Sequence, residues 1–204
     1  RSFFTYDGGQ TLPKFQYMPY EGFWQAFNLI HNALPQITTV FGIERTHEGR
    51  GAPGLKIHAG TRPNRRGVLF IGGMHARELV NPDILVSLAF DLLSVYKSFK
   101  TLRYGNKLFG NSLIKRIVNN FDIYIFPLAN PDGRVHAQNV RSFWRMNRNP
   151  NGGHTCSICG LDGKGVDVNR NFDFLWNSGI HTSTDPCHCD QIYKGTSPFS
   201  EPDS

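Results

Sequence analysis

The sequence predicts an α/β domain, in which helices cover a sheet whose strands alternate with them along the chain. Short stretches rich in β-branched and apolar residues indicate strands, and apolar residues at helical spacing indicate amphipathic helices. Strands are expected at residues 37–43, 54–58, 66–72 and 121–126, and helices at 20–34, 81–99 and 110–118. Such alternation is typical of an α/β sheet. A chain of 204 residues is long enough for one domain, or a large part of one, with a substantial core.

The two longer helices have recognisable ends. Pro35 ends the first helix, because proline cannot continue a helical hydrogen-bond ladder. Asn81-Pro82-Asp83 predicts the start of the second helix, with asparagine as the cap, proline at the first helical position and an acid near the positive end. The strand at 66–72 is apolar throughout, which predicts burial on both faces. Residues 1–19 lack periodicity and predict an extended lead-in.

A histidine and a carboxylate follow the apolar strand at 66–72. His75 and Glu78 lie three residues apart, directly beyond the strand end. Ligands of α/β sheets bind beyond the carboxyl ends of strands. A catalytic zinc typically takes about three protein ligands, often two His and one Glu, and keeps one position for water. The motif therefore offers two ligands of a metal site.

The cysteines form two tight pairs, Cys156/Cys159 and Cys187/Cys189. An even number in loops rich in Gly, Ser, Thr and Pro indicates disulfides, with bonds between the two pairs favoured, and a secreted or extracytoplasmic protein. A structural zinc held by four thiolates is the alternative. Both interpretations remain open.

Composition argues against two classes of partner. The formal net charge is +6, but the basic residues are scattered rather than gathered in one patch, so nucleic-acid binding is not expected. The chain has no run of eighteen apolar residues, so no membrane span is expected either.

Several segments in order carry a resemblance to a known family. They are Glu48-Gly49-Arg50, His75-x-x-Glu78, Asn130-Pro131-Asp132-Gly133, Trp144-Arg145, residues 166–172, Tyr193-Lys194-Gly195 and residues 198–202. Together they resemble the zinc metallocarboxypeptidases, the family of carboxypeptidases A and B and their bacterial relatives. The resemblance implies a mixed, mostly parallel sheet flanked by helices. It also implies that residues 20–204 are the N-terminal two-thirds of a catalytic domain that is incomplete at its C-terminus.

The resemblance implies a role for each matching residue. His75 and Glu78 match the first two ligands of a Zn²⁺ cofactor, and Asp167 matches an acid that accepts the other ring N–H of that histidine. Arg145 matches the catalytic guanidinium that stabilises the oxyanion.

Three further matches concern the substrate. Asn169 and Arg170 match a pair that binds its terminal carboxylate, and Arg77 matches a residue that contacts its penultimate part. Arg141 is a candidate for a second substrate-binding arginine, although one extra residue before Trp144 shifts its alignment with the family's motif. Residues 130–133 are expected to be a structural turn.

The family's third zinc-binding histidine, its general-base glutamate and a tyrosine that closes over the substrate have no counterpart in the matched positions. His181 and His188 are the remaining candidates for the third ligand, although they precede the expected position. The resemblance therefore implies that a complementary polypeptide carries the rest of the domain, or that the sequence is cut short, and that this chain alone is inactive.

The first functional hypothesis is a zinc-dependent exopeptidase that releases C-terminal amino acids from peptides or proteins. The alternative from another class is a non-catalytic fragment or pseudo-enzyme that binds peptide C-termini through Asn169 and Arg170. Within the enzyme class, a peptidoglycan peptidase or an amino-acid deacylase would share His75 and Glu78. Deacylases of this kind commonly lack the segments at 130–133 and 169–172, so these segments favour a peptidase.

Overall fold

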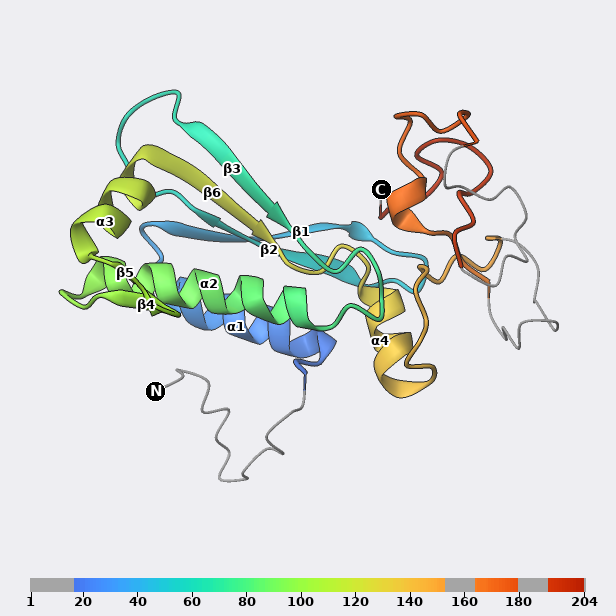
Figure 1. Ribbon diagram of the computed structural model, residues 1–204, viewed down its shortest axis with the longest axis horizontal. Helices are drawn as coiled ribbons and strands as arrows, with labels where there is room; N and C mark the ends of the chain where they lie inside the picture. The colour runs from blue at the N-terminus through green and yellow to red at the C-terminus, as the bar shows by residue number, and fades with distance from the viewer. Residues whose placement is uncertain (1–16, 153–163, 180–190, 204) are drawn as a thin grey trace.

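The computed structural model describes residues 17–152, 164–179 and 191–203 (Figure 1). A four-stranded sheet has the order β1 (Thr38–Arg45), β2 (Gly51–Ile57), β6 (Phe121–Phe126), β3 (Arg66–Ile71). The helices are α1 (Tyr20–Ala33), α2 (Val80–Lys97), α3 (Asn111–Asn120), α4 (Pro131–Asn139) and the 3₁₀ turn η1 (Val168–Arg170). A separate ribbon is made of β4 (Leu102–Tyr104) and β5 (Lys107–Phe109).

The predicted α/β class, with a mixed sheet and packed helices, is confirmed. Among the described strands, β1 pairs with β2 and β2 pairs with β6 in antiparallel fashion, whereas β3 and β6 are parallel. Parallel pairing is therefore not predominant in this part of the chain. For β1 and β2 the reason is local, because a short turn joins them and a short connection between neighbouring strands makes them antiparallel. The antiparallel pairing of β2 with β6 joins segments that are far apart in the chain.

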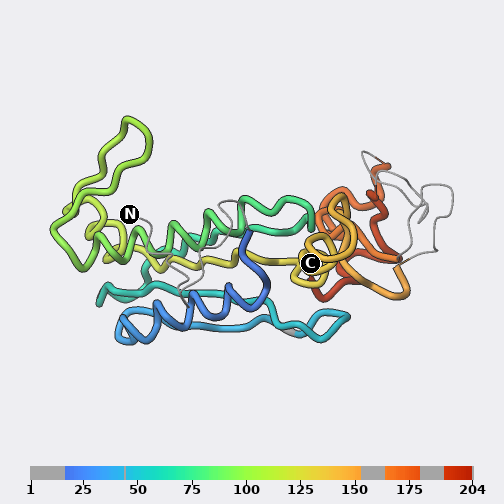
Figure 2. Tube along the Cα trace, turned by 90° about the horizontal axis from the view of Figure 1, so that it is seen from below, coloured from blue at the N-terminus to red at the C-terminus, as the bar shows by residue number. Residues whose placement is uncertain are grey.

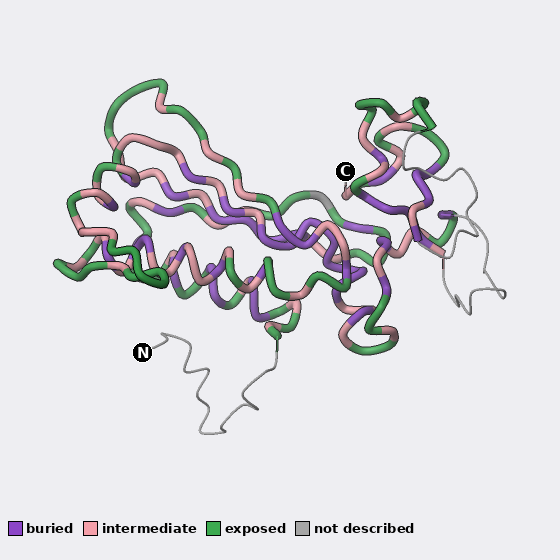
Figure 3. Tube along the Cα trace, in the orientation of Figure 1, coloured by how far each residue is buried: buried purple, intermediate pink, exposed green. Residues whose placement is uncertain are grey.

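The main core lies between one face of the sheet and the helices α1 and α2, which run side by side beneath it (Figures 1 and 2). Phe23 and Phe27 of α1 are fully buried against the sheet, as the helical spacing predicted. They meet Leu55 and Ile57 of β2, which are equally inaccessible. Figure 3 shows this buried layer running along the strands towards the loops at one end of the sheet.

The expectation that the strand at 66–72 is buried on both faces is wrong. β3 is an edge strand within the described part of the chain, paired only with β6. Leu69 is 58% exposed and Ile71 is 46% exposed. Apolar composition could not distinguish a central strand from an edge strand, because that distinction depends on which segment lies alongside.

Two other local expectations also differ from the structure. α2 begins at Val80 and not after Asn81, whose side-chain Oδ1 instead accepts a hydrogen bond from the Gly73 amide at 3.1 Å. The segment at 130–133 is the first turn of α4 rather than an isolated turn, because the Asn130 side chain caps that helix at the amide of Gly133. The β4–β5 ribbon was not expected, since each of its strands has only three residues.

The described helices include none with the length and apolar character needed to cross a bilayer. The cysteines Cys156, Cys159, Cys187 and Cys189 lie outside the described residues, and so do His181 and His188. Residues 1–16 of the expected lead-in lie outside them as well, and α1 begins at Tyr20, as predicted.

Candidate metal centre

The candidate site lies on the loop that follows β3, where the backbone packs closely against the residues that follow β6. Gly73 has a φ of +66°, and a Cβ atom there would lie 2.9 Å from the carbonyl oxygen of Pro127, so a larger residue would clash. The Ala129 amide donates to the Gly72 carbonyl at 2.9 Å, which continues the pairing of the two strands beyond their ends. This geometry directs the chain from the strand end into His75.

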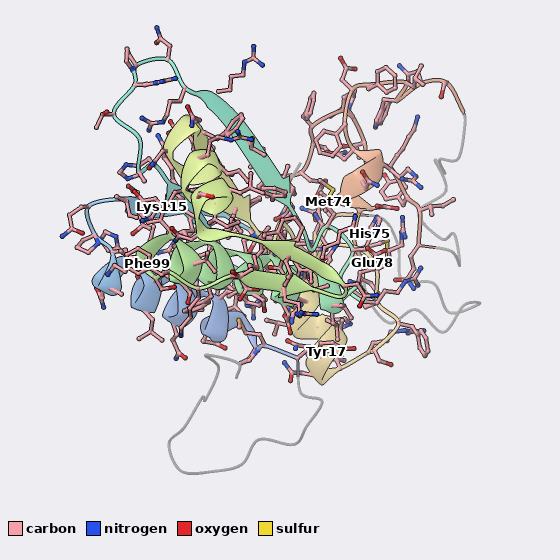
Figure 4. All side chains as sticks on the ribbon, turned by 60° about the vertical axis from the view of Figure 1, so that its left-hand side comes forward. Tyr17, Met74, His75, Glu78, Phe99 and Lys115 are labelled. Carbon is pink, nitrogen blue, oxygen red and sulfur yellow. The ribbon has the colours of Figure 1, made fainter. Side chains whose placement is uncertain are left out.

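His75 and Glu78 lie close together, as expected from their spacing. The Nδ1 atom of His75 is 2.8 Å from Oε1 of Glu78. Figure 4 shows both side chains at this end of the molecule, far from Phe99 and Lys115 at the opposite end. The His75 side chain is mostly buried, whereas that of Glu78 is half exposed. The pair therefore lies at the rim of the sheet.

Asp167 lies on the other side of the histidine ring. Its Oδ1 atom is 3.3 Å from Nε2 of His75, a nitrogen with no other partner, although the angle is not that of a regular hydrogen bond. Its Oδ2 atom accepts a hydrogen bond from Nε of Arg145 at 2.9 Å. The carboxylate is thus inaccessible to solvent but flanked by an imidazole and a guanidinium.

The environment of Asp167 keeps it ionised. Burial alone would raise its pKa, but the neighbouring His75 ring and the Arg145 guanidinium outweigh burial and hold the pKa below its usual range. A buried carboxylate is tolerated where it is paired in this way. The negative charge is therefore a permanent part of the site near neutral pH.

The donor atoms around His75 suit a metal cation. Asp167 can only accept hydrogen bonds, so in a neutral imidazole the proton belongs on Nε2, and Nδ1 presents its lone pair to the Glu78 carboxylate. Two electron-pair donors that face each other are bridged favourably by a cation. Imidazole nitrogen and carboxylate oxygen are common zinc ligands. The two side chains therefore fit two positions of a zinc site, and within residues 17–152, 164–179 and 191–203 no third His, Cys, Asp or Glu completes the set.

The predicted substrate residues lie next to this group. Asn169 and Arg170 form η1 directly after Asp167, whose Oδ1 atom caps the turn at the amide of Asn169 at 3.1 Å. The Asn169 side chain is exposed, and Nη1 of Arg170 donates to the Asn169 carbonyl at 3.0 Å. Arg77 is exposed and donates to the carbonyl of Phe143 at 3.2 Å. The matched positions are therefore brought together from three separate segments of the chain.

Asn130 joins two of those segments. Its amide nitrogen donates to the carbonyl of Met74 at 3.1 Å and to that of Met146 at 3.0 Å, and the asparagine is completely buried. Met74 precedes His75 and Met146 follows Arg145. The interpretation of this motif as structural agrees with these contacts, although its form is a helix cap.

The early motif at 48–50 supports the same helix from outside. Nη1 of Arg50 donates to Oδ1 of the buried Asp132 at 2.8 Å, and the amide of Glu48 donates to Oδ2 at 2.8 Å. Asp132 lies in the first turn of α4, so the β1–β2 turn fixes the helix that Asn130 caps. Two motifs recognised separately in the sequence are thus one structural unit.

Two residues without an assigned role organise the other half of the site. Asn171, the second asparagine of the motif at 169–172, donates to the carbonyls of Lys194 and Ser197 and accepts the amide hydrogen of Glu201 at 3.0 Å. Gln191 accepts a hydrogen bond from the amide of Arg145 at 2.8 Å. Asn171 could have been identified from its place in a motif, but no local pattern marks Gln191.

Comparison with known proteins shows the family and the solved structures that this chain resembles. The family described as zinc carboxypeptidase matches residues 24–204. Carboxypeptidase B of Helicoverpa zea is 34% identical over 202 residues, which cover 98% of this chain and 42% of that protein. The crystal structure of carboxypeptidase A from Helicoverpa armigera superposes with a TM-score of 0.73 at 27% identity, covering 93% of this chain and 41% of the other.

A further relative, from Talaromyces stipitatus, is named "Inactive metallocarboxypeptidase ecm14"; it is 29% identical over 189 residues, which cover 90% of this chain and 28% of that protein. The chain therefore spans less than half the length of these relatives. The family match nevertheless extends over most of the chain, and its range spans the segments that carry His75, Glu78, Arg145 and Asp167. The chain belongs to the zinc carboxypeptidase family.

Proposed function

We propose that this chain contributes to the zinc-dependent hydrolysis of the C-terminal peptide bond of peptides or proteins. The observation that supports this most directly is that Asp167 and Arg145, from two other segments of the chain, meet the His75–Glu78 pair beyond the end of β3. In this proposal His75 and Glu78 are two zinc ligands, Asp167 is the acid that orients His75, and Arg145 is a fixed cation, and each lies within contact distance of at least one of the others. A bound zinc would polarise the scissile carbonyl and lower the pKa of water.

Each residue of the chain has a distinct task in this proposal. Asp167 fixes the ring of His75 so that Nδ1 faces the metal position. Arg145, whose Nε is already paired with Asp167, stabilises the negative charge that develops on the substrate oxygen. Asn169 and Arg170 bind the terminal carboxylate, since a guanidinium is suited to that group. Arg77 contacts the penultimate part of the substrate.

The third zinc ligand and the general base would come from polypeptide outside residues 1–204. Support comes from the share of the relatives that this chain spans, 42% in the Helicoverpa zea protein, and from the incomplete ligand set in the described residues. Native mass spectrometry with metal analysis would test this: one zinc bound in the presence of additional polypeptide is expected. A 204-residue chain that was active on its own would contradict it. We also propose an extracytoplasmic location with disulfides among the four cysteines.

The function is tested by incubating the zinc-loaded full-length protein with matched peptides that end in a free carboxylate or an amide. We expect the last amino acid to be released only from the peptide with a free carboxylate. Removing zinc should abolish this release, and returning zinc should restore it. Cleavage within the peptides, or activity independent of zinc, would contradict the proposal.

Replacing Arg170 with Ala should weaken binding of peptides with a free C-terminus by about tenfold or more, because a hydrogen bond to a charged group contributes about 1.5–3 kcal/mol. Binding of amidated peptides should change little, and Arg170→Lys should fall between the two. The affinities are measured by titration calorimetry, with the exposed Arg66→Ala on β3 as the control variant. An equal loss for both kinds of peptide would exclude carboxylate recognition by Arg170.

The second candidate is a protein that binds peptide C-termini without cleaving them. It is favoured by the relative that is named inactive, and it would use the same Asn169 and Arg170. The peptide assay separates the two candidates, because tight binding of free C-termini with no release of amino acids from the zinc-loaded protein would favour the non-catalytic role.

A further inference from the structure

Three hydrogen bonds hold Arg145 in place, and they come from three different segments. Its side chain donates from Nε to Asp167, and its carbonyl accepts the amide hydrogen of Ala76 at 3.0 Å. These two partners are the paired acid and the neighbour of His75. The third bond runs from the Arg145 amide to Oε1 of Gln191 at 2.8 Å. Gln191 belongs to no recognised motif, yet its side chain fixes the backbone amide of Arg145.

The other end of the Gln191 side chain is also engaged. Its Nε2 atom donates to the carbonyl oxygen of Phe143 at 3.2 Å, an atom that also accepts from Arg77. The side chain therefore spans the backbone from Phe143 to Arg145, and Gln191 is only 6% exposed. A buried amide whose two ends are both bonded holds its partners in a defined geometry.

The backbone of Gln191 is strained. Its φ is +58°, in the left-handed region that favours glycine. A non-glycine residue is strained in this conformation and persists there only where the surrounding structure imposes it. Glycine would take this conformation freely but would leave the Arg145 amide without its partner. The strained backbone therefore holds a side chain that accepts a hydrogen bond from the Arg145 amide, which glycine could not do.

The same short segment holds the acid that pairs with Arg145. The amide of Asp167 donates to the carbonyl of Tyr193 at 2.8 Å. Gln191 and Tyr193 are two residues apart, so residues 191–193 contact both members of the Arg145–Asp167 ion pair. In Figure 1 this segment, in red, runs beside residues 164–179 at the end of the sheet.

We propose that Gln191 is a positioning residue, which holds the Arg145 backbone so that its guanidinium keeps the orientation needed at the oxyanion. The proposal rests on the proposed peptidase function for its catalytic consequence. The structural part of the proposal is independent of that function. Without Gln191, the Arg145 amide loses the partner that orders it, whatever reaction the site performs.

The test compares Gln191→Gly, Gln191→Glu and the parent in the zinc-loaded full-length protein. Gln191→Gly removes the side chain without adding backbone strain, and the exposed Gln36→Ala serves as the control. We expect kcat to fall about tenfold in Gln191→Gly, because a less well-oriented Arg145 guanidinium would stabilise the oxyanion less, by an amount comparable to about one hydrogen bond, while KM changes less than about twofold. Gln191→Glu keeps the acceptor for the Arg145 amide and should recover part of the kcat.

A purely structural role would lower the melting temperature and leave kcat per zinc-loaded molecule unchanged, and that result would overturn the proposal. Amide hydrogen exchange at Arg145, measured without substrate, is the second readout. Faster exchange in Gln191→Gly but not in Gln36→Ala is expected, and equal exchange in parent and variant would overturn the proposal. If the parent showed no peptidase activity, the proposed function would fail, and the exchange result would still decide the role of Gln191.

Discussion

Replacing Arg145 with Ala in the zinc-loaded full-length protein should lower kcat by about 10²–10³, the usual cost of losing one oxyanion donor. Arg145 is suited to this task because its pairing with Asp167 and its backbone hydrogen bonds to Gln191 and Ala76 fix the guanidinium before substrate arrives. KM should change much less, since in the proposed function Asn169 and Arg170, rather than Arg145, bind the terminal carboxylate of the substrate. Steady-state kinetics with a peptide that has a free C-terminus would measure both constants.

Arg145→Lys provides a matched comparison, because it keeps the positive charge beside Asp167 but loses the planar fork. We expect an intermediate kcat for that variant. Arg103→Ala, at an exposed position on β4 far from the site, is the control. Zinc content and melting temperature must be compared as well, because Ala at 145 leaves Asp167 with fewer partners. A kcat within about twofold of the parent would exclude the proposed role.

Replacing Asp203 with Asn should stabilise the protein at pH 8 and change its stability little at pH 4. Burial raises the pKa of Asp203 to about 7, with Asp132 and Glu201 adding in the same direction, while the hydrogen bond from Asn147 and the charge of His47 oppose it. In the unfolded chain the pKa is near the ordinary value of 3.8.

The sign follows from proton binding. Between pH 4 and 7 the folded state holds one more proton at Asp203 than the unfolded state, so stability falls as the pH rises. The difference of about three pKa units corresponds to about 4 kcal/mol. Asp203 is only partly buried, so solvent screening reduces the expected gain at pH 8 to about 2–3 kcal/mol. Urea denaturation at several pH values would measure it.

The exposed Asp173→Asn, in the neighbouring loop, is the control for the removal of one charge. Its effect should be small at every pH. If Asp203→Asn had the same effect on the free energy of unfolding at pH 5 as at pH 8, then Asp203 would not be protonated in the folded protein, and the buried acidic group around it would be organised differently from the description above.

The sequence predicted the elements whose signal is local and periodic. Apolar spacing located α1, because one stripe of that helix faces the core, and β-branched runs located the four strands of the main sheet. Position within the sheet was not predictable for β3, since burial depends on its neighbours rather than on its own composition. The role of Asn81 was missed because its cap-like context is local, whereas its real partner, the Gly73 amide, belongs to the end of a strand.

Only the residues of the candidate site that belong to recognisable sequence motifs could be predicted. His75 and Asp167 are far apart in the sequence, and only the resemblance to a family placed them together; in the structure Nε2 of His75 lies 3.3 Å from Oδ1 of Asp167. Gln191 and Asn171 act through backbone atoms of distant segments. Such contacts depend on how the chain folds back on itself, and the identity of the backbone partner leaves no trace in the sequence.

The described residues contain two hairpins, β1–β2 and β4–β5, whose turns are alike in one respect: each has a glycine with positive φ and open space around it, Gly49 and Gly105. They differ in what their turns hold. The turn before Gly49 donates through the Glu48 amide to buried Asp132, so grafting a peptide there would loosen α4 and the loops that α4 supports. The ribbon at Gly105 extends from the opposite end of the fold (Figure 2), and is the better place for an inserted tag or fluorophore.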